Sequence, residues 1–251
     1  MPKSRILNIE IDNLTLSKSL QEFDKGVLFT PNVDHFINLQ KDREFYDNYQ
    51  KADWIVCDSK IVQYASRFLG NPIVEKISGS DFFPAFYTYH RDNPAIRIFL
   101  LGTASSKIVD AAKENINNDC GRDIVIESHA PSFGFENDEE ENSWICNRIN
   151  QSGATVLALG VGSPKQEKWI MKYKDQIPGV TIFMGIGATI DFEAGHVKRA
   201  PKWMSDAGVE WLYRVFKEPH RLWKRYLIDD MPFFWLILKQ KLGMYKNPWK
   251  N

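Results

Sequence analysis

Short apolar runs alternate with amphipathic stretches through the first 192 residues of the chain. Short apolar runs are typical of strands buried on both faces, and apolar positions spaced near 3.6 residues predict helices. The runs predict strands at residues 26–30, 54–58, 96–102, 124–128, 155–162 and 180–192, after a strand pair or extended lead-in and a short helix within 6–23. The amphipathic stretches predict helices at 34–52, 61–70, 79–90, 104–118, 138–151 and 164–176, and Ser80 or Asp81 is the expected N-cap of the third.

This alternation predicts an α/β fold, with a mostly parallel sheet covered by helices on both faces. After residue 195 the apolar strand pattern stops. Prolines then open three helical stretches, from Pro201 to about 217, from Pro219 to about 228 and from Pro232 to about 242. We therefore expect two domains, an α/β catalytic domain at 1–195 and a helical appendage at 196–251.

The appendage is basic and rich in tryptophan. It holds 12 Lys and Arg against 5 Asp and Glu, a net charge of +7, and five of the eight tryptophans, whereas the rest of the chain has a net charge of −7. Either the appendage reaches a negatively charged partner, or its solvated surface pairs with the acidic body. Its last helical stretch joins aromatic residues to Lys239, Lys241 and Lys246, which is typical of a helix lying in a membrane interface. We expect the appendage to contact a membrane surface.

Other patterns restrict the location and class of the protein. No window of 18 uncharged apolar residues is present, and the N-terminus lacks the pattern of a signal peptide. The three cysteines are far apart, which favours a reducing compartment and offers no metal-ligand spacing. We expect a cytoplasmic protein, peripheral on the inner face of the cell membrane, with no nucleic-acid partner, no cofactor and no bound metal. Self-association through the apolar faces of the appendage is a further expectation.

Glycines and polar residues follow most of the predicted strands. Ligands of open parallel sheets bind beyond the carboxyl ends of the strands, glycines let the backbone approach a ligand closely, and the N–H groups opening a helix can hold a phosphate. The expected ligand-contacting residues at these ends are Thr30, Asn32, Asp58, Gly102, Thr103, Gly160, Gly162, Ser163, Pro164, Gly187 and Asp191. An ordinary tight turn between strand and helix would give the same pattern. Phe133 and Phe135 are candidates for stacking on a nucleobase, although core packing explains either one as well.

Known nucleotide motifs do not match these turns. The segments "GVGSPK" and "GIGATI" lack the third glycine of a dinucleotide fingerprint, and no P-loop is present. No Asp-x-Asp pair follows an apolar strand, and "DFE", which begins at Asp191, is the nearest to one. An enzyme that uses a nucleotide-sugar without such a pair must neutralise its leaving diphosphate with Arg and Lys.

Several segments resemble the WecG/TagA/CpsF family of glycosyltransferases. They include "TPNVDH", "ADWIVCDSKIVQYASRFLG", "EKISGSD", "LGVGSPKQEKWI" and "GIGATIDFEAGHVKRAPKWMSDAGVEWLYRVFKEPHRLWKRYL", and they follow one another in order over nearly the whole chain. The resemblance implies a Rossmann-like fold. It also implies an inverting, metal-independent enzyme that moves a sugar from a UDP-sugar, such as UDP-N-acetylmannosamine, to a polyprenyl-diphosphate-linked saccharide during teichoic acid or exopolysaccharide synthesis.

The resemblance also assigns roles to single residues. It implies that Asp58 is the catalytic base and that Thr30, Asn32 and Gln166 belong to the catalytic site. Its C-terminal arginines match Arg214, Arg221 and Arg225, which would stabilise the leaving diphosphate; they could instead lie on a helix surface. Two positions depart from the family pattern. Ser59 replaces a frequent glycine, and Lys76 replaces a frequent arginine whose two-pronged contact a lysine cannot make.

The chemistry of inverting transfer requires a base that removes the proton of the acceptor hydroxyl. Asp58 is suited to this role, but it could merely cap the following helix. His35 and Cys57 lie close to these segments, and we expect both to be structural. An alternative function is a membrane-associated nucleotide-binding module without transfer activity.

Overall fold

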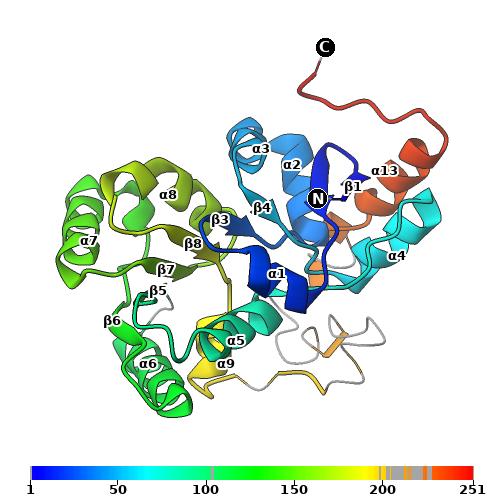
Figure 1. Cartoon of the computed structure of the whole chain (residues 1–251). Helices are drawn as coiled ribbons and strands as arrows, with labels where there is room; N and C mark the ends of the chain where they lie inside the picture. The colour runs from blue at the N-terminus through cyan, green and yellow to red at the C-terminus, as the bar shows by residue number, and fades with distance from the viewer. Residues whose placement is uncertain are drawn as a thin grey trace. The chain divides into compact units, whose positions relative to one another are not determined.

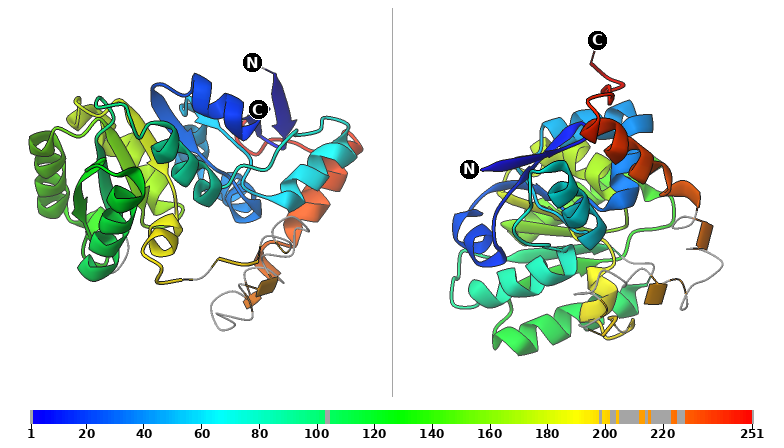
Figure 2. Two further views of the ribbon diagram at one scale, coloured as in Figure 1. Left: turned by 60° about the horizontal axis from the view of Figure 1, so that its bottom comes forward. Right: turned by 90° about the vertical axis from the view of Figure 1, so that its right-hand side faces the viewer.

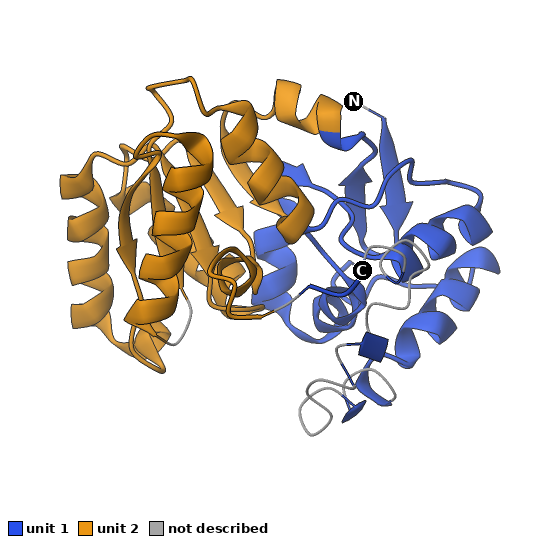
Figure 3. Cartoon of the chain, turned by 90° about the horizontal axis from the view of Figure 1, so that it is seen from below, with its two compact units in different colours: residues 1–16, 30–78, 199–251 blue, residues 17–29, 79–198 orange. Residues whose placement is uncertain are grey.

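The computed structural model describes residues 2–102, 105–197, 199–201, 204, 212–213, 215, 223–224 and 228–250. Its central feature is a six-stranded sheet with helices around it, in a Rossmann-like α/β fold (Figure 1). The strand order is β4-β3-β8-β7-β5-β6. The chain divides into two compact units (Figure 3). Unit 1 comprises residues 1–16, 30–78 and 199–251, and unit 2 comprises residues 17–29 and 79–198. The predicted division at residue 195 stays a prediction.

Unit 2 contains five strands of the sheet and the helices between them. The strands are β3 (Gly26–Phe29), β5 (Ile98–Gly102), β6 (Val125–His129), β7 (Val156–Gly160) and β8 (Ile182–Gly185). The helices are α1 (Leu16–Glu22), which begins at the end of unit 1, α5 (Gly79–Tyr89), α6 (Ser106–Cys120), α7 (Glu139–Ser152), α8 (Lys165–Tyr173) and α9 (Thr189–Glu193). Two 3₁₀ turns lie at Phe135–Asn137 and Lys174–Gln176.

The inner strands of unit 2 pair in parallel, and their side chains are apolar on both faces, as is typical of a parallel sheet covered by helices. Every residue of β5, β7 and β8 is buried. Their registers are parallel throughout, with Gly102 opposite Gly160 and Leu159 opposite Gly185. Helix α8 packs on β7 and β8, and α6 packs on β5 and β6 (Figure 1). The carboxyl ends of β5, β7 and β8, which were predicted to bind ligand, therefore lie at the same edge of the sheet in unit 2.

Unit 1 joins the N-terminal part of the chain to its C-terminus. Its elements are the antiparallel pair β1 (Lys3–Ile6) and β2 (Ile9–Asp12), α2 (Val33–Lys41), α3 (Arg43–Gln50), β4 (Trp54–Ile55), α4 (Lys60–Leu69) and α13 (Pro232–Lys241). Helix α13 packs against α4 and α2 (Figure 2). The Leu7 N–H donates to Gln240 Oε1 at 2.7 Å, and Trp249 Nε1 donates to the Leu39 carbonyl at 2.7 Å. These bonds fix the C-terminal segment to the first strands and helices of unit 1.

Three sequence predictions are wrong in detail. The single helix expected at 34–52 is two helices, because Asp42 is extended and its carboxylate caps α3 by accepting the Phe45 N–H at 3.0 Å. The single strand expected at 180–192 is the strand β8 followed by the helix α9. Helix α5 begins at Gly79, so Ser80 and Asp81 lie in its first turn and neither is its N-cap.

The C-terminal predictions can be compared with the structure only in part. The helix predicted to begin at Pro232 is confirmed as α13. Most of the other two helices, at 201–217 and 219–228, lies outside the described residues. In the part of the chain that the structure describes, no helix is both long enough and apolar enough to cross a bilayer.

Candidate active site

Two glycines hold the ends of β5 and β7 close to their neighbours in unit 2. A Cβ atom on Gly102 would lie 2.6 Å from the carbonyl oxygen of Gly160. A Cβ atom on Gly160 would lie 2.6 Å from the carbonyl oxygen of Gly187 and 2.9 Å from Ile190 Cδ1. Any side chain at either position would push these backbones apart. Gly102 and Gly160 are therefore required for the contact between successive strand ends.

The turn after β7 has open space around its glycine, unlike the ends of β5 and β7. Gly162 adopts a φ of +86°, and a Cβ atom there would meet nothing within 4 Å. Ser163 follows, with its Oγ buried and without a hydrogen-bond partner among the described residues, and a cis peptide joins it to Pro164. Pro164 is the N-cap of α8 and donates no hydrogen bond from its own nitrogen. This turn combines open space with an unsatisfied hydroxyl, which suits contact with a polar ligand.

Gln166 lies in the first turn of α8, and its side chain is buried. Its Oε1 accepts the N–H of Gly187 at 3.0 Å, and its Nε2 donates to Glu167 Oε1 at 2.9 Å. Both ends of the amide are therefore bonded inside unit 2. The geometry makes Gln166 the residue that holds the turn after β8 against the first turn of α8.

Two phenylalanines were candidates for stacking, and they lie in different environments. Phe135 is 3% exposed and packs on Trp169, with 6.4 Å between ring centroids. Phe133 is fully exposed, and Lys165 Nζ lies 5.2 Å from the centre of its ring. Core packing thus accounts for Phe135, and Phe133 is the ring that is accessible for stacking.

Lys165 also forms an ion pair with Glu136. Burial raises the pKa of Glu136, but the hydrogen bonds from Lys165 and from the backbone, together with the charge of Lys165, outweigh it, so the pKa is lowered overall. Glu136 Oε2 is buried and has no hydrogen-bond partner within the described part of the chain. The sequence does not indicate Glu136 as a site residue. Its ion pair joins residues 29 positions apart, and neither strand nor helix periodicity predicts such a contact.

In unit 1, Thr30 and Asn32 follow the strand β3, and Thr30 is buried. Asn32 is the N-cap of α2: its Oδ1 accepts the Asp34 N–H at 3.1 Å, and its own N–H donates to His35 Nδ1 at 3.3 Å. His35 is buried beside the rings of Phe45 and Tyr49. The expectation that His35 is structural is confirmed, and Asn32 has a capping function in addition to any contact with a ligand.

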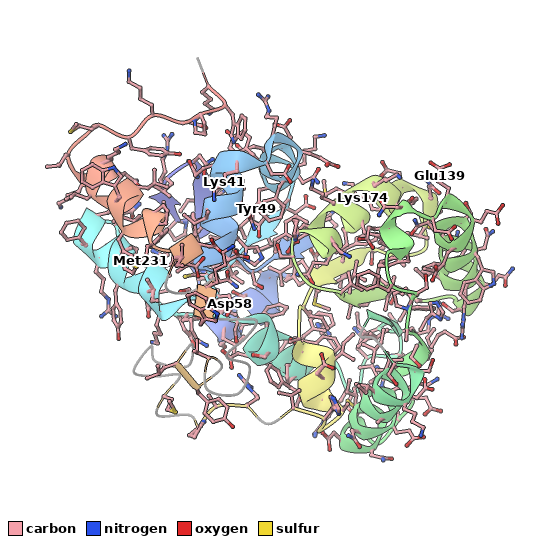
Figure 4. All side chains as sticks on the ribbon, turned by 180° about the vertical axis from the view of Figure 1, so that it is seen from behind. Lys41, Tyr49, Asp58, Glu139, Lys174 and Met231 are labelled. Carbon is pink, nitrogen blue, oxygen red and sulfur yellow. The ribbon has the colours of Figure 1, made fainter. Side chains whose placement is uncertain are left out.

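Asp58 is half-buried and lies between the end of β4 and the start of α4 (Figure 4). Its N–H donates to the carbonyl of Pro31 at 3.1 Å, which places it beside the Thr30–Asn32 turn. The N-cap of α4 is Ser59, whose Oγ accepts the Val62 N–H at 3.3 Å. Helix capping, the alternative role for Asp58, is therefore filled by the next residue.

Lys76 is held near Asp58 because the N–H of Ile77 donates to the carbonyl of Cys57 at 2.7 Å. The pKa of the Cys57 thiol is raised to about 12, mainly by burial; the charge of Asp58 contributes to the rise, while the hydrogen bond with the Ser59 backbone and the charge of Lys76 oppose it. A buried thiol with this pKa is not a nucleophile near neutral pH, so the expectation that Cys57 is a core residue is confirmed. Both charged side chains lie close enough to this sulfur to affect its titration.

The structure therefore places the candidate residues in two groups. Thr30, Asn32, Asp58 and Lys76 lie in unit 1, and the glycine turns and Gln166 lie in unit 2. Asp191 is half-buried in the first turn of α9 in unit 2, where its carbonyl accepts the N–H groups of His196 and Val197. The candidates that lie outside the described residues are Thr103, Arg214, Arg221 and Arg225. Among the described residues, no group of three or more His, Cys, Asp or Glu could hold a metal ion.

Comparison with known proteins gives one family over nearly the whole chain. The description "Glycosyl transferase WecG/TagA/CpsF family" matches residues 4–247. The chain is 27% identical, over 100% of its own length and 98% of the relative's, to an N-acetylglucosaminyldiphosphoundecaprenol N-acetyl-beta-D-mannosaminyltransferase of Bacillus subtilis (strain 168). A protein with the same description from Staphylococcus aureus (strain MW2) is 26% identical over 97% of this chain and 95% of its own.

Proposed function

Because the chain belongs to the WecG/TagA/CpsF family of glycosyl transferases, we propose that it transfers a sugar from a UDP-sugar to a polyprenyl-diphosphate-linked saccharide. The observation that carries this proposal is the full-length similarity to relatives described as acting on N-acetylglucosaminyldiphosphoundecaprenol. Their descriptions also name an N-acetyl-β-D-mannosaminyl group as the group transferred. UDP-N-acetylmannosamine or a related hexose is therefore the proposed donor, and inversion the proposed stereochemical course.

Asp58 is the proposed general base. In the transfer step, the acceptor hydroxyl oxygen forms a bond to the anomeric carbon of the donor while the bond from that carbon to the diphosphate oxygen breaks. The hydroxyl proton passes to the Asp58 carboxylate, and UDP leaves with the bonding electron pair. The half-buried position of Asp58 and the capping of α4 by Ser59 support this role, because the Asp58 carboxylate is not required to cap α4. Such base catalysis contributes roughly 10²–10⁴ in rate.

Binding of the donor is proposed for the strand ends of unit 2. Gly162 and Ser163 offer an open turn and a buried hydroxyl without a partner in the described structure. The exposed ring of Phe133, next to Lys165, suits stacking on uracil. Arg214, Arg221 and Arg225 are proposed to neutralise the leaving diphosphate in place of a metal ion. Gln166 is proposed to act by positioning Gly187.

We further propose that the protein acts at the inner face of the cell membrane, where a lipid-linked acceptor is accessible, and that its C-terminal appendage makes the contact. The basic, tryptophan-rich composition of the appendage supports this location. Self-association remains part of the proposal.

A UDP-release assay tests the proposed function. Purified protein is incubated with a polyprenyl-diphosphate-linked N-acetylglucosamine and a panel of UDP-sugars, and the products are analysed by mass spectrometry. We expect stoichiometric UDP release and a glycolipid heavier by one sugar residue for at least one donor. UDP binding without release for every donor would favour the alternative of a nucleotide-binding module.

A further inference from the structure

In the part of the chain that the structure describes, two neighbouring helices of unit 1 each have an exposed apolar face. Helices α4 and α13 pack side by side (Figures 1 and 2). Large apolar side chains on or next to them are 38% to 61% exposed: Tyr64, Phe68, Met231, Phe234, Trp235, Leu238 and Leu242. Met231, at the start of α13, is labelled in Figure 4. We call this set of residues the aromatic face.

The aromatic face of α13 is additional to the face that folds the unit. Phe233 and Ile237 are buried and attach the helix to unit 1, and the Phe233 ring packs on Phe36. Phe234, Trp235 and Leu238 lie on the other side, and this side continues to Leu242 one turn later. At 3.6 residues per turn, these exposed positions span an arc of about 100°. A helix that is apolar on two sides needs a second apolar environment besides the described core of unit 1.

The two helices of the aromatic face carry only positive charges, and the nearest acidic residues in the sequence of α13 are Asp229 and Asp230, just before Met231. Neither α4 nor α13 contains an acidic residue, and none follows between 242 and 251. Arg67 lies over the ring of Tyr64 at 5.8 Å, and Lys239 lies over the ring of Trp235 at 5.5 Å. Lys241 of α13 lies over the ring of Phe68 of α4, also at 5.5 Å. This last contact joins the exposed sides of the two helices into one surface.

We infer that the aromatic face is a docking surface for an anionic lipid bilayer. Helix α4, which lies outside the C-terminal appendage, shares this contact with α13. Aromatic and aliphatic side chains enter the interfacial layer, while Lys and Arg extend to the lipid phosphates. A second copy of the chain fits less well, because a two-fold contact would place cations against cations. The inference rests on the proposed function and extends it, because α4 contacts the membrane together with the C-terminal appendage.

This arrangement has a consequence for the acceptor. Helix α4 begins at Lys60, two residues after Asp58, and its ten residues span about 15 Å. Docking through Phe68 and Tyr64 therefore keeps the Asp58 turn within about 15 Å of the part of the protein that touches lipid.

The test measures vesicle binding of single variants of the full chain. Phe68→Glu on α4 and Trp235→Glu on α13 place a negative charge on the aromatic face without removing a buried side chain. The matched control is Trp144→Glu, because Trp144 is similarly exposed but lies on α7 of unit 2. Co-sedimentation is measured with phosphatidylglycerol-rich vesicles and with phosphatidylcholine vesicles. Circular dichroism confirms folding, and Phe68→Leu tests for rescue by another apolar side chain.

We expect the wild-type protein, Phe68→Leu and Trp144→Glu to bind the anionic vesicles at least tenfold more tightly than the neutral ones. Both Glu variants on the aromatic face should lose at least tenfold in affinity for anionic vesicles. Unchanged binding of Phe68→Glu would overturn the role of α4. If the wild-type protein is an oligomer and the two Glu variants are monomers with unchanged vesicle binding, the face joins copies of the chain. That result would overturn the inference.

A separate measurement distinguishes this inference from the proposed function. Turnover is assayed with a short-chain acceptor that dissolves in water. We expect the two Glu variants to retain wild-type turnover on this acceptor and to lose at least tenfold on a long-chain acceptor in vesicles. If the wild-type protein shows no turnover on any acceptor, the proposed function is contradicted. The vesicle-binding results would still show whether the aromatic face binds lipid.

Discussion

The side-chain oxygen of Gln166 accepts a hydrogen bond from the backbone N–H of Gly187, 3.0 Å away and 21 positions later in the sequence. The bond links the first turn of α8 to the turn that follows β8. Since a Cβ atom on Gly160 would lie 2.6 Å from the Gly187 carbonyl, the same turn is also in contact with the end of β7. Gln166 therefore sets the geometry of the candidate donor site without facing open space.

We predict that Gln166→Ala lowers the free energy of unfolding by about 1–3 kcal/mol, because it leaves the Gly187 N–H without its acceptor. UDP affinity should fall as well, since the turn after β8 loses its support. Urea denaturation and UDP titration measure the two effects. Gln151→Ala, at an exposed position of α7, is the control and should change neither. Wild-type stability of Gln166→Ala together with weaker UDP binding would instead indicate direct contact with the ligand.

The sequence was sufficient to predict the parallel sheet, because β5, β7 and β8 are buried over their whole length and their residues are almost all apolar. Boundaries that depend on one local hydrogen bond were less predictable. Asp42 divides one amphipathic stretch into α2 and α3 by capping α3, and hydrophobic periodicity does not register such a cap. The apolar segment 180–192 continues through a turn into α9, so composition alone did not show where β8 ends.

Candidate site residues were predictable where they follow a strand, as with Gly162, Ser163 and Asp58. Contacts between distant parts of the chain were not. The Glu136–Lys165 ion pair and the bond from Leu7 to Gln240, which spans 233 positions, arise only once the chain has folded. For the same reason the sequence did not distinguish buried Phe135 from exposed Phe133, two residues apart in one segment.

The three cysteines should differ in their reactivity towards iodoacetamide. Burial raises the pKa of Cys57 to about 12 and that of Cys146 to about 11, and both side chains are buried. Cys120 is only partly buried. At pH 8 in the native protein we expect Cys120 to be alkylated first, at least tenfold faster than the other two. Peptide mass spectrometry measures the order, and equal labelling of all three in urea is the control. Labelling of native Cys57 at the rate of Cys120 would contradict its burial.

Asp12 should make stability depend on pH. Its carboxylate accepts the Ile55 N–H at 2.8 Å, and burial raises its pKa despite that bond and the charge of Lys3. At pH values between the usual Asp pKa and this raised pKa, the folded state binds more protons than the unfolded state. The Asp12 contribution to the free energy of unfolding therefore falls as pH rises through this window.

Asp12→Asn should remove this fall while its side-chain oxygen still accepts the Ile55 N–H. Urea denaturation at a series of pH values upwards from 3.8, the ordinary pKa of an Asp side chain, gives the slope for each protein. Asp47→Asn, on α3 where the side chain is 40% exposed and paired with Arg43, serves as the control and should retain the wild-type slope. Identical slopes for Asp12→Asn and the wild-type protein would show that Asp12 does not titrate in this window.

We predict that transfer continues in the presence of EDTA. The basis is the absence of an Asp-x-Asp pair after an apolar strand in the sequence, together with the arginines proposed to stabilise the leaving diphosphate. Initial rates are compared before and after treatment with EDTA, with a metal-dependent glycosyltransferase as the positive control. Complete loss of activity that Mg²⁺ or Mn²⁺ restores would contradict the metal-independent mechanism.

Asp58→Asn should lower turnover by at least about a hundredfold, because the amide cannot take the proton of the acceptor hydroxyl. The backbone bond from Asp58 to Pro31 does not involve the side chain, and Ser59 caps α4. We therefore expect the unfolding transition and the affinity for UDP to stay at wild-type values. Turnover is measured by UDP release at saturating donor and acceptor. Asp53→Asn, at an exposed position just before β4, is the matched control and should retain activity. If Asp58→Asn keeps near-normal turnover, another group removes the proton. If it loses UDP affinity in parallel with turnover, Asp58 binds the donor and does not act as the base.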